Sequence, residues 1–144
     1  MMLDGEADVA LATALIEAVS STRAKGHEMS EQGDELEEVD PEEAASLIAG
    51  GAYLLDVREP DEWEAGHAPE AHHIPLGDLE ARYGEIPSDQ TIVCVCRGGG
   101  RSARAAAALS TVGLTTINLA GGMRAWESSG LPVVVADDGA GTVI

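Results

Sequence analysis

Hydrophobic positions along the chain fall into short runs that polar, glycine-rich turns separate. Apolar runs of four or five residues are typical of buried strands, and segments rich in alanine, leucine and charged residues are typical of helices. Strands are predicted at residues 53–57, 72–76, 92–95 and 115–119, and helices at 61–65, 77–83, 102–111 and 123–129. Strands that alternate with helices at this spacing predict an α/β fold, with a mostly parallel sheet and helices on both faces.

The pattern before residue 53 is more varied. Asp40 suits the N-cap of a helix and Pro41 its first position, so a helix is predicted to begin there and to end at the glycines of residues 50–51. Residues 8–24 place apolar side chains near one face and predict an additional helix. Residues 26–40 are polar, acidic and punctuated by glycine, which is typical of a linker.

Composition narrows the classes of partner. The chain has 26 acidic and 8 basic residues, a net charge of −18. This charge disfavours nucleic acid and anionic membranes as partners. The apolar run at residues 9–19 contains Glu17 and follows three acidic residues, unlike a signal peptide or a membrane span. Two cysteines only two positions apart do not suggest a disulfide framework, so we expect a reducing, cytoplasmic location.

One stretch carries positive charge although the chain as a whole is strongly acidic. Residues 91–104 hold both cysteines and three of the eight basic residues. Cys96 follows the predicted strand, and the glycines of residues 98–100 lead into the predicted helix. Glycines permit positive φ and allow successive N–H groups to point at one anion. The helix N-terminus adds its dipole, and Arg97 and Arg101 add full charges.

Surroundings of this kind lower the pKa of cysteine thiols, so Cys96 is predicted to be a nucleophile. A flexible glycine linker beside a buried structural cysteine is the simpler alternative. That alternative explains neither the arginines nor the position between a strand and a helix.

The segment Cys96-Arg97-Gly98-Gly99-Gly100-Arg101-Ser102 resembles the active-site loop of the rhodanese (sulfurtransferase) family. The segments at residues 54–63, 66–76 and 118–126 also resemble rhodanese segments, in the same order. The resemblance covers about residues 37–135, which leaves residues 1–36 as an N-terminal extension and 136–144 as a tail. It implies a three-layer α/β fold with a central, mostly parallel five-stranded sheet.

The resemblance also implies a reaction and a set of roles. Cys96 would take a sulfane sulfur from thiosulfate or a persulfide, and would pass it to a thiophilic acceptor. No metal or organic cofactor is expected, and a protein persulfide is one expected donor. The substrate-binding residues would be Arg97, Gly98, Gly99, Gly100, Arg101, Ser102 and Arg58. Asp56 would support the structure by bonding loop amides or pairing with Arg58, and a general-base role for it is the less favoured alternative.

Two other functions compete with this one. Cys96 and Arg101 form a C-x4-R loop, whereas the related cysteine phosphatases use C-x5-R to hold a tetrahedral phosphate, so the shorter loop favours a single sulfur atom. A second alternative is a protein-interaction or sulfur-carrier module without turnover. The charge of −18 repels free anionic donors at long range and a protein-bound persulfide less.

Cys94 lies two residues before Cys96, so strand alternation places both side chains on one face of the sheet. We expect Cys94 to lie inside the sheet as a buried structural thiol. A resolving role, in which it forms a disulfide with Cys96, would require a strained short span.

Overall fold

A computed structural model describes residues 37–137 and 139–144, and its centre is a five-stranded sheet. The strands are β1 (Glu38–Val39), β2 (Tyr53–Asp56), β3 (Ala71–His73), β4 (Thr91–Val95) and β5 (Thr115–Leu119). They lie in the order β1-β5-β4-β2-β3, and every pair is parallel. The predicted α/β fold with a parallel sheet is therefore confirmed.

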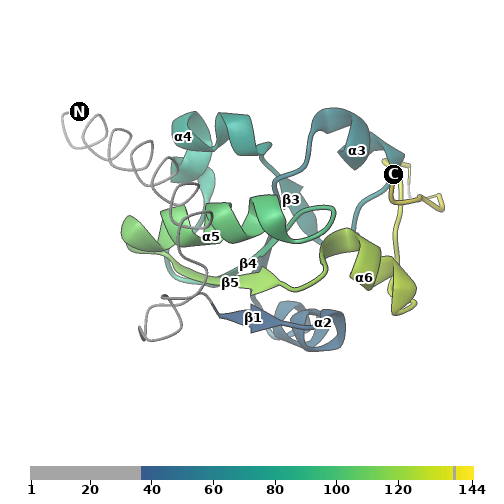
Figure 1. The fold of residues 1–144 in the computed structure, drawn as a ribbon, viewed down its shortest axis with the longest axis horizontal. Helices are drawn as coiled ribbons and strands as arrows, with labels where there is room; N and C mark the ends of the chain where they lie inside the picture. The colour runs from purple at the N-terminus through teal and green to yellow at the C-terminus, as the bar shows by residue number, and fades with distance from the viewer. Residues whose placement is uncertain (1–36, 138) are drawn as a thin grey trace.

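Helices cover both faces of this sheet (Figure 1). They are α2 (Pro41–Ala49), α3 (Pro60–Ala65), α4 (Leu79–Arg82), α5 (Gly100–Thr111) and α6 (Gly122–Ser128), with 3-10 turns η2 (Leu76–Asp78) and η3 (Tyr83–Glu85) on either side of α4. One core cluster joins α4 and α5 to one face, and the other joins α2 and α6 to the opposite face. Alternate strand residues enter the two clusters: Leu55 and Ile92 enter the first, and Leu54 and Val93 the second.

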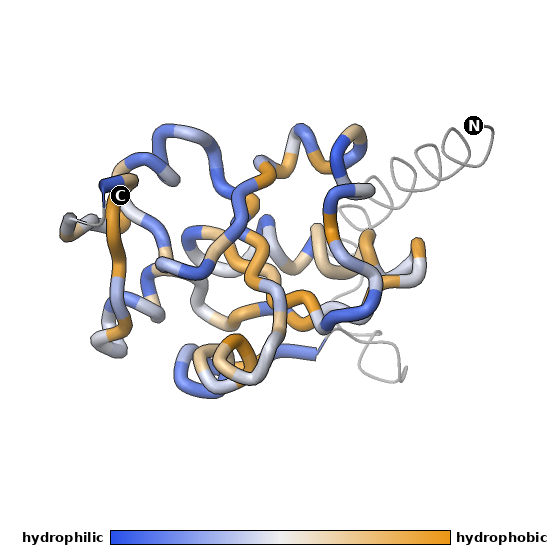
Figure 2. The backbone as a smooth tube through the Cα atoms, turned by 180° about the vertical axis from the view of Figure 1, so that it is seen from behind, coloured by the Kyte–Doolittle hydropathy of each residue, from blue (hydrophilic) through white to orange (hydrophobic). Residues whose placement is uncertain are grey.

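Local sequence explains where the helices begin. Asp40 caps α2, because its carboxylate accepts the Glu43 N–H at 2.8 Å, and Pro41 occupies the first turn as predicted. The buried face of α5 is mostly alanine, which lets the helix lie close to the sheet. Figure 2 shows the hydrophobic stretches along the inner strands and the hydrophilic ones on the outer helices and turns.

Two segments differ from the prediction. The linker predicted at residues 26–40 contains β1, whose two residues pair with Asn118 and Leu119 of β5. A two-residue edge strand is too short to leave a periodic pattern. The helix predicted at residues 77–83 is instead divided among η2, α4 and η3. The helix predicted at residues 8–24 lies outside the described residues.

The C-terminal segment folds back onto the domain. Val134 and His67 exchange two backbone hydrogen bonds of 2.8 and 2.9 Å, and the Thr142 N–H donates to the Ala65 carbonyl at 2.9 Å. Val133 and Val143 pack against the second core cluster. Within the described ranges, none of the helices has the length and apolar character that a membrane span requires.

Candidate active site

The parallel strands place their carboxyl ends along one edge of the sheet, and Cys96 lies directly after β4 on that edge. Its side chain is only 1% exposed, at the base of the loop that leads into α5. The neighbouring strand continues beside it, because the Val57 N–H donates to the Val95 carbonyl at 3.0 Å. The thiol thus lies between the end of the sheet on one side and the loop and α5 on the other.

Two donors point at the sulfur of Cys96. The Gly99 N–H lies 3.1 Å from Sγ, and the Ser102 hydroxyl lies 3.3 Å from it. The Ser102 hydroxyl also lies within hydrogen-bond distance of the Gly99 carbonyl and of Asn118 Oδ1, so its one proton is shared among three acceptors. The Gly99 N–H is therefore the more complete donor to the sulfur.

The three glycines of the loop are not equivalent. Gly99 has φ of +112°, the left-handed region that side chains disfavour, whereas Gly98 and Gly100 do not. A Cβ at Gly98 or Gly100 would meet nothing within 4 Å. The sequence suggested that the whole run could adopt positive φ, but only the glycine that donates to the sulfur uses this freedom.

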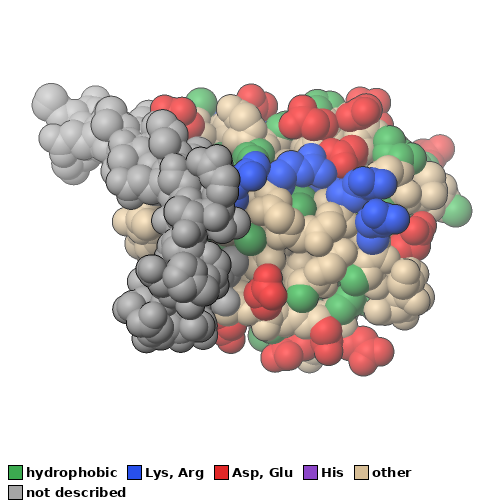
Figure 3. Space-filling view, viewed as in Figure 1, with side chains coloured by type: hydrophobic (Ala, Val, Ile, Leu, Met, Phe, Trp, Pro, Cys, Tyr) green, Lys and Arg blue, Asp and Glu red, His purple; other side chains and the backbone are tan. Residues whose placement is uncertain are grey.

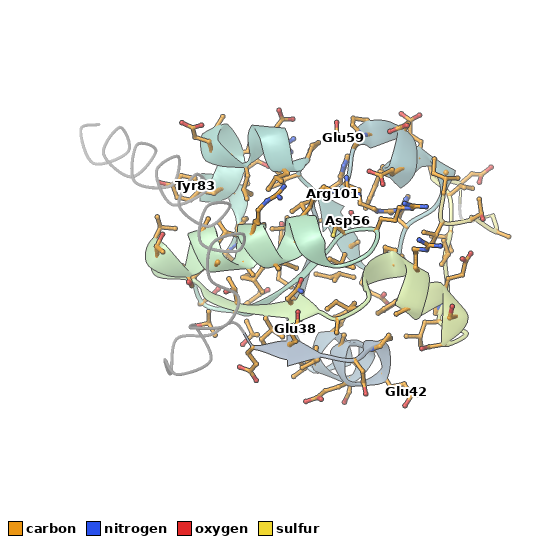
Figure 4. All side chains as sticks on the ribbon, in the orientation of Figure 1. Glu38, Glu42, Asp56, Glu59, Tyr83 and Arg101 are labelled. Carbon is orange, nitrogen blue, oxygen red and sulfur yellow. The ribbon has the colours of Figure 1, made fainter. Side chains whose placement is uncertain are left out.

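Arg101 connects the first turn of α5 to α3. Its guanidinium makes two bonds to Glu62, at 2.8 and 2.9 Å, and Figure 4 shows it extending from α5 toward α3. The Glu62 carboxylate also accepts the Glu59 N–H at 2.9 Å. The hydrogen bonds from Arg101 are the main reason that the pKa of Glu62 is lowered to about 2. Sequence reasoning singled out Arg101 but missed Glu62, whose position at N3 of a capped helix was the available signal.

Other arginines near the loop stay without acidic partners. Arg97 and Arg124 are exposed and Arg104 is half-buried, and none of the three forms an ion pair with another described residue. Figure 3 shows basic side chains gathered in a band on the face that carries α5 and α6, with acidic side chains around it. The positive potential at the loop is therefore local, in a strongly acidic chain.

The start of α6 holds the carbonyls of Cys96 and of the residue that follows it. The Met123 N–H donates to the Cys96 carbonyl at 2.7 Å, and the Arg124 N–H donates to the Arg97 carbonyl at 3.1 Å. Gly122 makes this approach possible, because a Cβ there would lie 2.4 Å from the Cys96 carbonyl oxygen. Gly122 lies directly before the helix predicted at residues 123–129, and the sequence pattern alone did not reveal this contact.

Arg58 and Asp56 lie inside the domain at the end of β2. Both side chains have 0% exposure, and the Arg58 guanidinium pairs with the Asp56 carboxylate at 2.9 Å. Arg58 also donates to the Gly66 carbonyl at 2.7 Å, while its Nη1 is buried without a partner. Both contacts expected of Asp56 are present, because its carboxylate also accepts the backbone N–H of Arg58, in the loop after β2, at 3.0 Å. The structure leaves no surface of Arg58 for a substrate, in contrast to the pocket-lining position expected from the sequence.

Cys94 shares the core cluster of Cys96 and, like it, is a free thiol. It is fully buried, and this burial is the main reason that its pKa is raised to about 12. The expected interior position is confirmed. Among residues 37–137 and 139–144, no group of three or more His, Cys, Asp or Glu side chains is placed to hold a metal ion.

A parallel α/β sheet with a buried cysteine between a strand and a helix N-terminus defines a class of α/β domain whose candidate site lies at the carboxyl ends of the strands. Comparison with known proteins makes the class specific. The Rhodanese-like domain family matches residues 40–129, and the chain belongs to this family.

Relatives and solved structures agree with the family. The chain is 36% identical over 105 residues to a sulfurtransferase of Allochromatium vinosum, a match that covers 71% of this chain and 98% of that protein. It is 36% identical over 107 residues to a Bacillus subtilis protein described as a sulfur carrier, covering 72% and 58%. The crystal structure of a rhodanese-related protein from Thermoplasma volcanium has a TM-score of 0.65 and 31% identity, covering 68% of this chain and 97% of that one.

Proposed function

We propose that the protein is a sulfurtransferase that carries a sulfane sulfur on Cys96 as a persulfide. One observation supports this most: the sulfur of Cys96 lies 3.1 Å from the Gly99 N–H and 3.3 Å from the Ser102 hydroxyl in a loop of six residues, inside a rhodanese-like domain. The donors favour a negatively charged sulfur, and the short loop suits one added sulfur atom.

The reaction has two displacements. In the first, the Cys96 thiolate attacks the sulfane sulfur of thiosulfate or of a persulfide. A new bond forms from Sγ to that sulfur, the donor's S–S bond breaks, and sulfite or a thiolate leaves with the electron pair. In the second, a thiophilic acceptor attacks the outer sulfur of the Cys96 persulfide, and Cys96 leaves as a thiolate. No net oxidation or reduction of the protein takes place.

The loop residues have distinct roles in this proposal. The backbone N–H groups from Arg97 to Ser102 receive the outer, negatively charged sulfur. Arg97 meets the anionic donor, because its side chain is exposed and unpaired among the described residues. Arg101 anchors the loop through Glu62.

Arg58 and Asp56 act as a buried pair that supports the end of β2 beside the loop. A reducing compartment such as the cytoplasm would keep Cys96 available as a thiol.

A second candidate is a carrier that holds sulfur for a protein partner without fast turnover. The similarity to the Bacillus subtilis sulfur carrier favours it, and so does the net charge of −18, which opposes free anionic donors. A protein-bound persulfide would meet less of this repulsion than thiosulfate.

A thiosulfate:cyanide assay distinguishes the two. We expect wild-type protein to form thiocyanate, Cys96→Ala to form none, and the wild-type rate to rise with salt because screening reduces the repulsion of thiosulfate. No activity of the wild type at low or high salt would favour the carrier. Hydrolysis of a phosphate ester that depends on Cys96 would contradict both.

A further inference from the structure

Asn118, at the end of β5, makes contacts that the reaction described so far does not use. Its side chain is only 1% exposed and forms three hydrogen bonds. The Oδ1 atom accepts the Ser102 hydroxyl at 2.6 Å, and Nδ2 donates to the Gly99 carbonyl at 3.2 Å and to the Glu38 carboxylate at 2.8 Å. All the hydrogen-bonding atoms of this amide except one lone pair of Oδ1 are therefore engaged.

Two of these partners are the residues that donate to the sulfur of Cys96. Gly99 presents its N–H to Sγ, and Asn118 holds the carbonyl of the same residue. Because Gly99 has positive φ, its peptide orientation depends on such contacts more than on local preference. The Ser102 hydroxyl has one proton, and its oxygen lies 2.6 Å from Asn118 Oδ1 and 3.3 Å from Sγ, so the shorter bond to Asn118 takes most of this proton. The amide thus positions the Gly99 N–H as the donor to the sulfur and holds the Ser102 hydroxyl beside it.

Glu38 fixes which way the Asn118 amide faces. The two ends of an amide differ only in that one donates and the other accepts. The Glu38 carboxylate only accepts, so it selects the orientation in which Nδ2 faces the edge strand and Oδ1 faces Ser102. Glu38 lies on β1 (Figure 4), and the sheet register pairs it with Asn118.

We propose that Asn118, oriented by Glu38, is a positioning residue that aims the Gly99 N–H at the sulfur of Cys96 and holds the Ser102 hydroxyl beside it. The proposal rests on the proposed function only in taking Cys96 as the nucleophile. It gives the edge strand β1 a role in reactivity: a carboxylate on the outer strand acts on the thiol through one amide and the loop residue that this amide holds.

A purely structural role for Asn118 is the alternative. The two roles can be distinguished because the backbone of Asn118 makes its structural contact independently of the side chain. The Asn118 N–H donates to the Glu37 carbonyl at 2.9 Å, and this bond joins β1 to β5 whatever the side chain is. Thr116 supplies a matched control, because it lies on the same strand and its hydroxyl donates to the Ala106 carbonyl at 2.8 Å, a partner other than the loop.

The test measures the rate at which iodoacetamide alkylates Cys96 as a function of pH, in full-length protein. Asn118→Ala is expected to lower the rate near neutral pH by about 3- to 10-fold and to move the profile to higher pH, as loss of one or two net hydrogen bonds predicts. Glu38→Ala should produce a smaller shift in the same direction. Glu38→Gln keeps an oxygen acceptor and should restore the wild-type profile, and Thr116→Val should not change it.

Nuclear magnetic resonance supplies a second readout. The Gly99 amide proton signal should move in Asn118→Ala and Glu38→Ala and stay in place in Thr116→Val. Identical pH profiles for wild type, Asn118→Ala and Glu38→Ala would overturn the proposal. If Asn118→Ala does not fold, the Glu38→Ala and Glu38→Gln pair decides the matter, because Glu38 is exposed on an edge strand. Alkylation does not require sulfur transfer, so a wild type that fails to transfer sulfur would overturn the proposed function and leave this result standing.

Discussion

The two cysteines lie two residues apart on the same face of the sheet, yet their surroundings differ in kind. Cys94 sits in the apolar core, where burial raises the pKa of its thiol to about 12. Cys96 is almost as buried, but its sulfur receives the Gly99 N–H and the Ser102 hydroxyl. The two thiols therefore differ in their hydrogen-bond partners and not in their exposed fraction.

This difference supports our proposal that the loop, not the strand, makes a thiol reactive in this fold. β4 delivers both sulfurs to one face, and only the second meets the donors at the helix N-terminus. Substitution of Cys94 in the strand should alter core packing, whereas substitution in the loop should alter the rate of sulfur transfer. The variants below test this division, from the largest expected effect to the smallest.

Replacement of each thiol in turn is the strongest test. Cys96→Ser should reduce sulfur transfer by about 10³-fold or more, because the nucleophile is lost. Cys94→Ala should keep the rate within about 2-fold and lower the free energy of unfolding by about 1 kcal/mol or more, since it leaves a small cavity. Initial rates and urea denaturation measure the two quantities. A Cys94→Ala protein that is stable but inactive would contradict the assignment of Cys94 as a structural thiol.

Breaking the buried pair beside the loop should chiefly affect stability. Asp56→Ala leaves the Arg58 charge buried and uncompensated, so we expect it to lower the free energy of unfolding by about 3–5 kcal/mol. The exposed pair of Arg82 and Glu85 is the control, and Glu85→Ala should unfold at the wild-type denaturant concentration. Wild-type stability in Asp56→Ala would show that the pair does not support this end of the sheet.

Alanine substitution along the glycine run tests which amide acts on the sulfur. Gly99→Ala forces a side chain into positive φ, at a cost of about 1–2 kcal/mol, and turns the N–H away from Sγ, so sulfur transfer should fall about 10-fold. Gly98→Ala and Gly100→Ala place their Cβ in open space and should keep the rate within about 2-fold. Equal losses at all three positions would contradict a special role for Gly99.

The smallest effect concerns the anchor between α5 and α3. Because Arg101 lowers the pKa of Glu62 to about 2 from an ordinary value near 4.5, the pair stabilises the folded state above pH 4.5 and loses this contribution as the pH falls toward 2. Glu62→Gln should therefore lower the free energy of unfolding by about 1 kcal/mol at pH 7, and the difference should shrink below pH 4.5. Denaturation at a series of pH values measures it, and a difference independent of pH would contradict the linkage.

Strong local signals predicted much of the fold from the sequence. The cap at Asp40, the apolar runs of β2, β4 and β5, and the glycine loop each have a physical signature within a few residues. The strand β1 has none, because a two-residue strand is defined by its partner β5 and not by its own pattern.

The residues of the candidate site also divide into those with a local signal in the sequence and those without one. Cys96 and Arg101 stand out in a run of glycines and charges, so sequence reasoning identified them. Glu62, Asn118 and Glu38 make contacts that span 39, 16 and 80 positions along the chain, and one sequence does not reveal such pairs. Arg58 shows the converse, since the family resemblance implied a substrate-binding role while the fold buries it against Asp56.

The central claim is that Cys96 holds the transferred sulfur, and mass spectrometry tests it most directly. Protein would be incubated with thiosulfate or a small persulfide, its intact mass recorded, and the modified residue located by peptide mapping. We predict a gain of one sulfur atom on Cys96 in the wild type and in Cys94→Ala, lost on addition of cyanide and absent from Cys96→Ser. An added sulfur on Cys94, or none on Cys96 with any donor, would contradict it.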